Sequence, residues 1–321
     1  MSPFDQAERL SHIVPRNFLS ILDFTPAQLR ATLELGIRVK TDRKQGQSAP
    51  TAQALAGRHV GLLFEKPSLR TRVTFTIGVR ELGGDIVEIP ADVMHADREP
   101  LDDVARNLER WIDAVVIRTF GQDRLLEITQ ATPELAVINA LSNEEHPCQA
   151  LADMLTLAER WDGKFEGRRL AFVGDGNNVC TSLVHAAMML GMSMHVATPK
   201  GFELPDEVVD QAAEVSQAGA GLTEFTDPKA AVRDVDAVYT DVWTSMGQEV
   251  EYAERQRKFT RYQVNEALMA LARPDAVFMH CLPAHRGEEV TDEVIESPAS
   301  VVFAQAENRL HAQKAMLVKV L

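Results

Sequence analysis

The chain has 321 residues, of which 45% are hydrophobic and 25% charged, so we expect a folded globular protein, with two domains more common than one at this length. The formal net charge of −14 argues against sequence-independent nucleic-acid binding, which needs a basic surface, so local arginines must meet any anionic ligand. The sequence shows neither a secretory signal nor a run of about 20 apolar residues for a membrane helix, so we expect a cytoplasmic protein without membrane contact.

The three cysteines, Cys148, Cys180 and Cys281, lie far apart and form no C-x-x-C pair. This spacing favours free thiols over a disulfide framework or a zinc ribbon. We therefore expect reduced thiols and no bound metal.

The first half of the chain predicts an early helix followed by alternating strands and helices. Thr25-Pro26-Ala27-Gln28 has the form of a capping box with proline at the first helical position. A polar and flexible stretch over residues 45–53 follows. The predicted strands are His59–Phe64, Asp85–Ile89, Ala114–Arg118 and Ala136–Leu141, and the predicted helices between them are Thr71–Leu82, Leu101–Trp111 and Asp123–Ala131. This alternation is typical of βαβ units with a parallel sheet.

The alternation restarts after a longer predicted helix over Pro147–Trp161. The later predicted strands are Leu170–Gly174, Met194–Thr198, Ala237–Val242 and Ala276–Cys281. A last predicted helix runs from about Glu307 to Leu321, and its pattern would allow it to pack on either half. We expect an α/β fold with two parallel-sheet αβα domains, joined by helices near residue 150.

A strand-to-helix turn over Phe64–Arg72, with the sequence FEKPSLRTR, is the strongest candidate for a ligand site. The start of a helix exposes unpaired N–H groups and the positive end of the helix dipole. Ser68 and Thr71 add hydroxyl groups, and Arg70 and Arg72 add guanidinium groups that suit phosphate oxygens. The spacing lacks GxxxxGK[ST], so it does not support a nucleotide triphosphatase. Taken by itself, such a turn is more often a helix capped by Ser68 with solvated arginines.

This turn resembles the carbamoyl-phosphate loop, S-[TML]-R-T-R, of the aspartate/ornithine carbamoyltransferase family. Glu145–Asp153 resembles the H-P-x-Q-x-L-x-D motif of the family, and Ala306–Arg309 resembles its A-E-N-R motif, whose arginine returns to the first domain. The resemblance implies that carbamoyl phosphate is bound by Ser68, Leu69 through its backbone, Arg70, Thr71, Arg118, His146, Gln149 and Arg309. The implied catalytic residues are Thr71, Arg118, His146 and Cys281. For Arg72 a structural role is implied.

The G-D-G-N-N sequence from Gly174 onward invites a dinucleotide interpretation, because G-x-G follows a predicted strand and opens a helix. Val179 stands at the third glycine position, however, and the next predicted strand ends without the acidic residue that binds a ribose. A nicotinamide cofactor is therefore disfavoured, and we expect no cofactor. The segment instead resembles the ornithine branch of the family, in which Asn178 would contact the amino acid.

Two further segments resemble that branch. Asp241–Gly247 is similar to D-x-W-x-S-M-G, and His280–Pro283 matches H-C-L-P. The implied ornithine contacts are Asn178, Asp241, Ser245, Met246, Cys281 and Leu282. The resemblance leaves open whether Cys281 acts as a base or only orients the amine.

Together these motifs imply transfer of the carbamoyl group of carbamoyl phosphate to the side-chain amine of L-ornithine, which gives L-citrulline and phosphate. The implied domains are 1–149 for carbamoyl phosphate and 150–304 for ornithine, with a C-terminal helix, 305–321, that packs back on the first. The implied assembly is a homotrimer or a multiple of trimers. Two alternatives stay open: a carbamoyltransferase for another amine, putrescine or N-acetylornithine, and a catalytically silent regulatory relative.

One loop departs from the family pattern. The family usually has Gln or His followed by [LI]-G between Ile89 and Glu99, whereas this chain has Val93-Met94-His95-Ala96-Asp97. In the family this loop reaches the active site of a neighbouring subunit. Either His95 takes that role after a shift of one residue, or the contact is absent.

Overall fold

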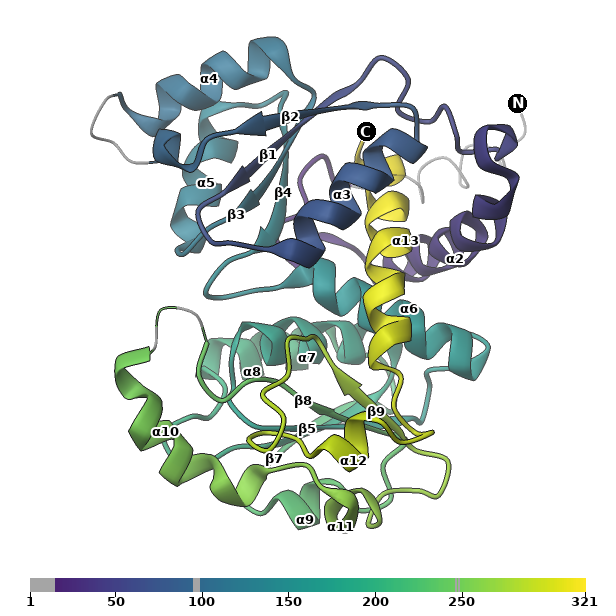
Figure 1. The fold of residues 1–321 in the computed structure, drawn as a ribbon, viewed down its shortest axis with the longest axis vertical. Helices are drawn as coiled ribbons and strands as arrows, with labels where there is room; N and C mark the ends of the chain where they lie inside the picture. Colours follow the sequence, from purple (N-terminus) through teal and green to yellow (C-terminus); the bar gives the residue numbers. More distant parts are fainter. Residues whose placement is uncertain (1–14, 95–98, 246, 248) are drawn as a thin grey trace. The chain divides into compact units, whose positions relative to one another are not determined.

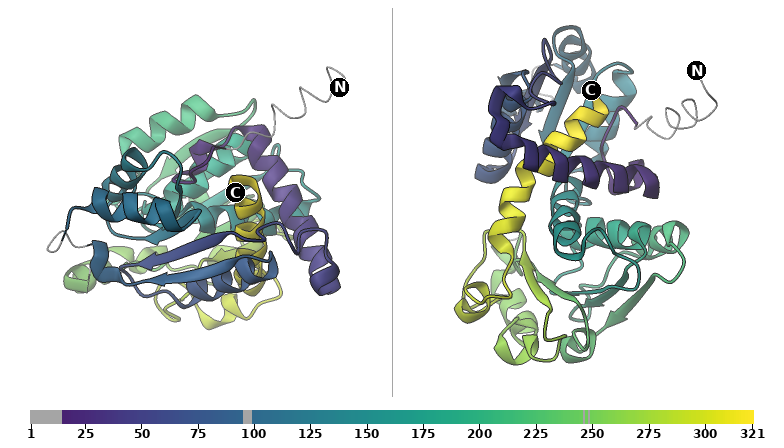
Figure 2. Two further views of the ribbon diagram at one scale, coloured as in Figure 1. Left: turned by 90° about the horizontal axis from the view of Figure 1, so that it is seen from above. Right: turned by 90° about the vertical axis from the view of Figure 1, so that its right-hand side faces the viewer.

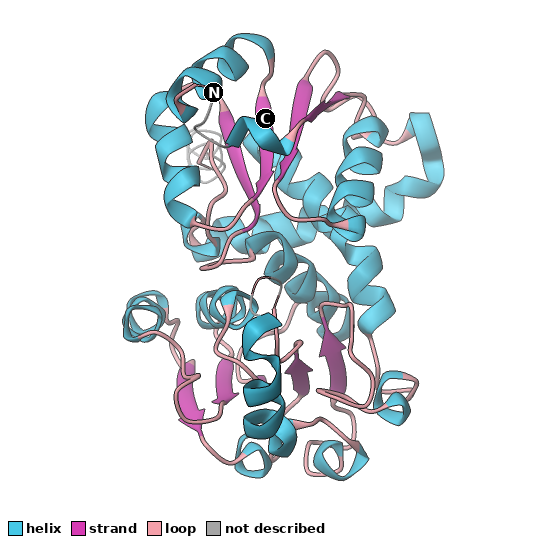
Figure 3. Cartoon of the chain, turned by 60° about the vertical axis from the view of Figure 1, so that its left-hand side comes forward, coloured by secondary structure: helices cyan, strands magenta, loops and turns pink. Residues whose placement is uncertain are grey.

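The structure is a computed structural model that describes residues 15–94, 99–245, 247 and 249–321. It divides into two compact units. The first runs up to Leu155 and takes in Asn308–Leu321, and the second is Thr156–Glu307. Each unit has its own parallel sheet with helices on both faces (Figure 1, Figure 3). The α/β class predicted from the sequence is therefore confirmed.

The sheet of the first unit has the order β2-β1-β3-β4, and all its pairings are parallel. The strands are β1 (His59–Phe64), β2 (Asp85–Ile89), β3 (Ala114–Arg118) and β4 (Ala136–Leu141), which are the predicted bounds. The chain crosses from β1 to β2 on one side, whereas β3 lies on the other side of β1. The carboxyl ends of β1 and β3 therefore flank a topological switch point, the place where parallel α/β sheets bind their ligands.

One face of this sheet is covered by α4 (Leu101–Trp111) and α5 (Gln122–Ala131). In the hydrophobic core on this face, alternate strand residues such as Leu63, Val115 and Ile117 pack against apolar residues of α4 and α5. Since β1 and β3 are buried on both faces, they consist almost entirely of apolar residues, as expected of central parallel strands.

The C-terminal helix α13 (Val302–Val320) packs within the first unit from Asn308 onward, beside α2 (Pro26–Asp42) and α3 (Leu69–Glu81) (Figure 2). Lys314 Nζ donates to Glu81 Oε2 on α3 at 2.9 Å, and Lys40 Nζ on α2 donates to Asn308 Oδ1 at 2.9 Å. The predicted return of this helix to the first domain is confirmed.

The predicted start of that helix was wrong, because α13 begins at Val302 rather than near Glu307. Val302 is buried in the apolar core of the second unit. Its first turn is therefore stabilised by packing and carries no capping signal in the sequence. The predicted start of α2 is confirmed: Thr25 Oγ1 accepts the Gln28 N–H at 3.2 Å, and Gln28 Oε1 accepts the Thr25 N–H at 2.8 Å.

The second unit contains a parallel sheet in the order β7-β6-β5-β8-β9. Its strands are β5 (Arg169–Val173), β6 (Ser193–Ala197), β7 (Gly221–Phe225), β8 (Ala237–Thr240) and β9 (Val277–His280). The four predicted strands are present with ends shifted by a residue or two, and β7 was not predicted. The order of the strands reverses between β5 and β8, so their carboxyl ends flank the switch point of this sheet.

Helices cover both faces of the second sheet. On one face lie α7 (Asn178–Leu190) and α8 (Asp206–Val215), and on the other lie α9 (Pro228–Ala231), α10 (Tyr252–Phe259), α11 (Glu266–Met269) and α12 (Asp292–Ile295). Helix α6 (Pro147–Trp161) runs across the boundary between the units, as α13 does. The short 3₁₀ helices are η1 (Ile21–Asp23), η2 (Arg43–Ser48), η3 (Ala91–Met94), η4 (Glu249–Glu251) and η5 (Thr260–Tyr262). None of the helices within the described ranges is both long and apolar enough to cross a membrane.

Candidate active site

The turn after β1 forms the start of helix α3. Ser68 is the N-cap, and its Oγ accepts the Thr71 N–H at 3.4 Å. A capping serine uses an oxygen lone pair, so its hydroxyl hydrogen can still be donated to a ligand. Leu69 is 76% exposed, and its predicted contribution is that of its backbone alone. Arg70 is half-buried beside it. Backbone N–H groups, a hydroxyl group and a guanidinium group thus meet at one helix start.

A chain of hydrogen bonds links three predicted carbamoyl-phosphate residues in the first unit. Arg309 Nη2 donates to Thr71 Oγ1 at 2.7 Å, and its Nη1 donates to Gln149 Oε1 at 2.7 Å. Gln149 Nε2 in turn donates to Asp153 Oδ1 at 2.8 Å. All four side chains are buried. The structure therefore brings Thr71, Gln149 and Arg309 together from α3, α6 and α13, although they are far apart in sequence.

His146 lies directly before α6, and its side chain is buried. Burial lowers the pKa of His146 well below its ordinary value, and the positive charges of Arg309 and Arg118 lower it further. The imidazole is therefore neutral at neutral pH and has one N–H to donate. Arg118 ends β3 next to the switch point, half-buried, so its positive charge belongs to the same group of residues.

Lys66 belongs to this group as well, and the sequence did not single it out. Its Nζ donates to Asn143 Oδ1 at 2.9 Å and lies 4.1 Å from the centre of the Phe120 ring. Burial lowers the pKa of Lys66, and the charge of Arg118 lowers it further. The available signal was the position of a lysine two residues after a buried strand, in the turn that leads to α3.

Arg72 faces a different environment from Arg70. Its guanidinium group forms an ion pair with Glu88 on β2 and lies 4.7 Å from the centre of the Phe64 ring. These contacts tie α3 to the sheet and support the structural role that the resemblance implies for Arg72.

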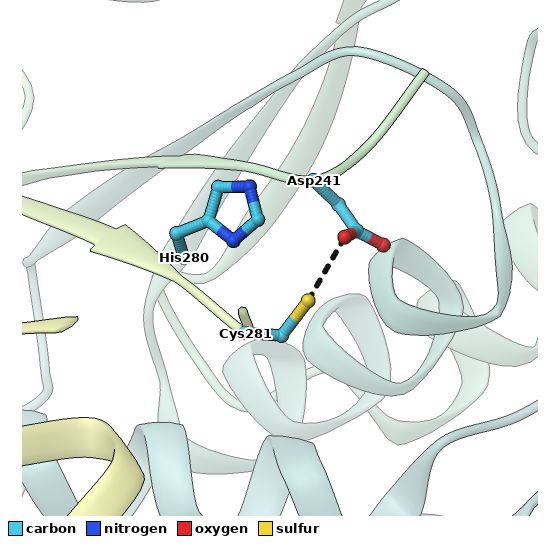
Figure 4. A group of neighbouring side chains, drawn as sticks. All are labelled: Asp241, His280 and Cys281. Atoms are coloured by element: carbon cyan, nitrogen blue, oxygen red, sulfur yellow. Dashed lines mark hydrogen bonds between the residues drawn. The ribbon is translucent and has the colours of Figure 1, made fainter. Parts of the chain in front are cut away.

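In the second unit, Asp241 lies beside Cys281, another of the predicted amino-acid contacts, and near His280 (Figure 4). Cys281 Sγ donates to Asp241 Oδ1 at 2.9 Å, Asn177 Nδ2 donates to Oδ2 at 2.9 Å, and the Val242 N–H donates to Oδ1 at 2.8 Å. Asp241 follows β8 and Cys281 follows β9, so both lie at the carboxyl edge of the sheet. The thiol is the donor in this contact.

Asn178 is the first residue of α7, and the preceding Asn177 is the N-cap, whose Oδ1 accepts the N–H groups of Val179 and Cys180 at 3.1 Å. Asn178 and Ser245 are both half-buried at the same edge of the sheet as Asp241. The predicted contact Met246 lies outside the described residues. Asn177 was not predicted as a functional residue, although its bond to Asp241 helps to orient that carboxylate.

Two buried residues support the H-C-L-P segment. His280 Nε2 lies 3.1 Å from Glu289 Oε1, and His280 Nδ1 accepts the Leu282 N–H at 2.8 Å. Leu282 adopts a left-handed backbone with φ of 57°, and the Leu282–Pro283 peptide bond is cis. The hydrogen bond from its backbone N–H to His280 thus fixes the position of Leu282, one of the predicted ornithine contacts.

Two groups of side chains have the spacing of metal ligands among the described residues: Asp241, His280 and Cys281, and His285, Glu288 and Glu289. In the first group, both ring nitrogens of His280 already have partners, and the Cys281 thiol donates to Asp241. A metal ion there would have to displace these contacts. The three cysteines are free thiols.

The loop that departs from the family pattern is only partly described. Met94 is buried in the core of the first unit, and its carbonyl oxygen accepts from Arg124 Nη1 at 2.6 Å. Its side chain is therefore turned into its own unit. His95 lies outside the described residues.

Comparisons with known proteins agree with this division of the site. Residues 16–159 match the family model of the aspartate/ornithine carbamoyltransferase carbamoyl-P binding domain, and residues 166–320 match that of the Asp/Orn binding domain. The chain is 44% identical to an ornithine carbamoyltransferase from Halalkalibacterium halodurans, over 98% of each chain, and 49% identical to one from Acidothermus cellulolyticus, over 94% of this chain and 95% of the relative.

Solved structures are similar throughout the chain. The ornithine carbamoyltransferase from Pyrococcus furiosus superposes with a TM-score of 0.89 at 43% identity, over 95% of this chain and 97% of that chain. The ornithine carbamoyltransferase from Thermus thermophilus gives a TM-score of 0.84 at 42% identity, over 96% and 99%.

Proposed function

Since this chain belongs to the aspartate/ornithine carbamoyltransferase family, we propose that it transfers the carbamoyl group of carbamoyl phosphate to the side-chain amine of L-ornithine, giving L-citrulline and phosphate. The observation that carries this proposal is the pair of side-chain groups at the two switch points. One group is cationic and suits an acyl phosphate. The other has a carboxylate beside a thiol and suits an amino acid with a second amine.

The first group supplies the contacts for the donor. Ser68, Leu69 through its backbone, and Arg70 would bind the phosphate, while Arg309 holds Thr71 and Gln149 in place. Gln149 would accept from the carbamoyl NH₂ group. As the amine attacks the carbamoyl carbon, negative charge develops on the carbonyl oxygen and then on the leaving phosphate. Thr71, Arg118 and His146 are the donors that would stabilise this charge.

The neutral state of His146 fits this role. A neutral imidazole can donate one hydrogen bond to the carbonyl oxygen without adding a third positive charge next to Arg118 and Arg309. Each well-placed donor at a developing oxyanion contributes roughly 3 kcal/mol, which corresponds to about two orders of magnitude in rate. Direct attack of the amine needs no covalent intermediate with the protein and no cofactor.

The second group supplies the contacts for the acceptor. Asn178, Asp241, Ser245, Met246, Cys281 and Leu282 are the proposed ornithine residues. The Asp241 carboxyl group, which accepts from the Cys281 thiol, would attract the ammonium form of the substrate. The amine must lose a proton before it attacks, and the Asp241–Cys281 pair is the proposed place for that loss.

The functional division is part of the proposal. Residues 1–149 would bind carbamoyl phosphate together with the C-terminal helix 305–321, and residues 150–304 would bind ornithine. We also propose a cytoplasmic enzyme of arginine metabolism that assembles as a homotrimer or a multiple of trimers. An exposed apolar stripe on α3, formed by Leu69, Val73 and Ile77, supports assembly because such a surface is unusual on a monomer. Light scattering measures this directly, and a monomeric mass would contradict it.

The test is a substrate panel with purified protein. Incubation with carbamoyl phosphate and L-ornithine should release citrulline and phosphate in equal amounts. Putrescine, N-acetylornithine and aspartate should give at most a small fraction of that rate. Turnover of one of these three without turnover of ornithine would replace the acceptor but keep the reaction class. Binding of carbamoyl phosphate without turnover of any acceptor would indicate a regulatory relative.

A further inference from the structure

Helix α10 carries a buried arginine, Arg255, that is not among the proposed substrate contacts. Only 6% of this residue is exposed, whereas Arg257 on the same helix is exposed to solvent. A buried guanidinium group must satisfy its charge and its donors with protein partners. The identity of those partners indicates what the residue does.

Arg255 connects two turns of the second unit. Its Nη1 donates to Asp175 Oδ2 at 2.6 Å and to the Trp243 carbonyl oxygen at 2.9 Å. Its Nε donates to Glu251 Oε2 at 2.8 Å, and its guanidinium carbon lies 4.8 Å from the centre of the Phe202 ring. One nitrogen atom therefore bridges a side chain of the β5–α7 turn and the backbone of the segment after β8.

These two turns carry proposed ornithine contacts. Asp175 lies in the G-D-G-N-N turn that leads to Asn178, and Trp243 lies between Asp241 and Ser245 in the chain. The turns flank the switch point between β5 and β8. The relative position of Asn178 and Ser245 therefore depends on how these two turns are held together.

Helix α10 also contacts the segment that follows β9, the strand next to β8. Tyr252 Oη donates to Glu288 Oε1 at 2.7 Å, and Gln256 Nε2 donates to Glu288 Oε2. Glu288 follows the H-C-L-P segment in the chain. Helix α10 thus has side-chain contacts to all three segments that carry proposed amino-acid contacts.

We propose that Arg255 is a positioning residue for the amino-acid substrate: by bridging Asp175 and the Trp243 carbonyl oxygen, it sets the spacing between the two turns that hold Asn178 and Ser245. This inference rests on the proposed function, since it assumes that these turns bind ornithine. Arg255 itself would not touch the substrate.

Electrostatics supports the geometry. Burial raises the pKa of Asp175, Arg255 lowers it, and the negative charges of Asp241 and Glu251 raise it further. Asp175 is therefore a buried carboxylate close to other carboxylates, and Arg255 is its compensating charge. Loss of one partner from a buried ion pair leaves the other charge uncompensated, so the turn would rearrange rather than stay in place.

Steady-state kinetics of Arg255→Gln tests the inference, with Arg257→Gln as the control because it removes the same charge from the exposed side of the same helix. We expect the KM for ornithine to rise at least about tenfold in Arg255→Gln. The KM for carbamoyl phosphate and the kcat at saturating ornithine should change by less than about threefold. Arg257→Gln should match the unmodified chain.

A purely stabilising arginine would give a different result. Its loss would lower the fraction of folded protein and the apparent kcat, but it would leave the KM for ornithine unchanged. Arg255→Lys separates the two cases further, because a lysine can restore one of the two Nη1 contacts and should recover part of the affinity for ornithine. An unchanged ornithine KM in Arg255→Gln, or an equal rise in both KM values, would overturn the inference.

Asp175→Asn gives an independent test of the same contact if Arg255→Gln does not fold. This variant removes the charge partner and nearly keeps its shape, and it should raise the same KM. The double variant Asp175→Asn with Arg255→Gln should be impaired no more than the worse single variant, since both changes break one contact. Fully additive effects would contradict the bridge. If the unmodified chain makes no citrulline, the proposed function fails; if it does and these variants keep their ornithine KM, only the positioning role fails.

Discussion

His146 shows how burial, together with two neighbouring charges, decides the chemistry of a single residue. A histidine beside a carboxylate gains a proton more easily, whereas His146 is buried near two arginines, which favour the neutral form. A positive imidazole would bind an anion more strongly but would cost free energy at a site that is already cationic. The arrangement therefore favours a fixed hydrogen-bond donor over a third charge.

The pKa of His146 predicts a pH dependence of stability. The group is neutral in the folded chain well below pH 6.5, whereas in the unfolded chain it binds a proton near pH 6.5. Below that pH the unfolded state holds more protons, so the free energy of unfolding should fall as pH falls, by up to about 1.4 kcal/mol per pH unit from this group. Thermal melts between pH 7.5 and 5.5 measure this slope.

The matched comparison is His146→Asn, which removes the titrating group but keeps a polar side chain. Its melting temperature should depend less steeply on pH than that of the unmodified chain. His285→Asn, at an exposed histidine outside the site, is the control for general effects of pH. An identical slope in His146→Asn and in the unmodified chain would show that another group controls this range.

The sequence singled out residues that belong to fixed motifs and passed over residues whose contacts depend on the fold. Ser68, His146 and Cys281 were proposed because their neighbours in the chain carry a pattern. Lys66 stood inside a quoted motif but acquired meaning only from its burial beside Arg118. Arg255 had no signal, because its partners Asp175 and Trp243 are distant in the chain.

At the scale of elements, the predicted bounds of a strand were correct where both faces of the strand are buried, because such a strand is a continuous run of apolar residues. The strands β1 and β3 are central and apolar, and their bounds were correct. Strand β7 was missed because it lies at the edge of its sheet and has a mixed sequence, G-L-T-E-F, with exposed residues. Its pairing with β6, rather than local propensity, makes it a strand.

The turn after β5 provides an element-scale prediction. A Cβ atom on Gly176 would lie 2.7 Å from the Glu203 carbonyl carbon, which is closer than real contacts allow. Gly176→Ala should therefore push this turn away from residues 203 and 204, lower the free energy of unfolding by about 2 kcal/mol and weaken ornithine binding.

Gly221→Ala is the control for that variant, since a Cβ atom there meets no atom within 4 Å. Urea unfolding curves and ornithine saturation curves for the two variants give the comparison. Equal stability and equal KM values in both would mean that the turn tolerates the side chain and does not position Asn178.

For the whole molecule, the sequence predicted two parallel sheets but not their strand orders. The restart of the strand and helix alternation after Pro147–Trp161 indicates two domains, yet no local pattern states whether β3 follows β2 across the sheet or lies beside β1. The observed orders put a switch point between β1 and β3 in one unit and between β5 and β8 in the other. The motifs of both units follow strands that flank these switch points or lie next to them. This position explains why the motif residues occur in short segments directly after strands.

The assignment of one substrate to each unit is the central claim, and saturation kinetics of Arg70→Ala and Asp241→Asn with both substrates tests it most directly. Arg70→Ala should raise the KM for carbamoyl phosphate by about tenfold or more, and Asp241→Asn should do so for ornithine, since hydrogen bonds to charged groups contribute roughly 1.5–3 kcal/mol. Each variant should leave the other KM within about threefold. If both variants raise the same KM, or each raises both equally, the two units do not divide the substrates in this way.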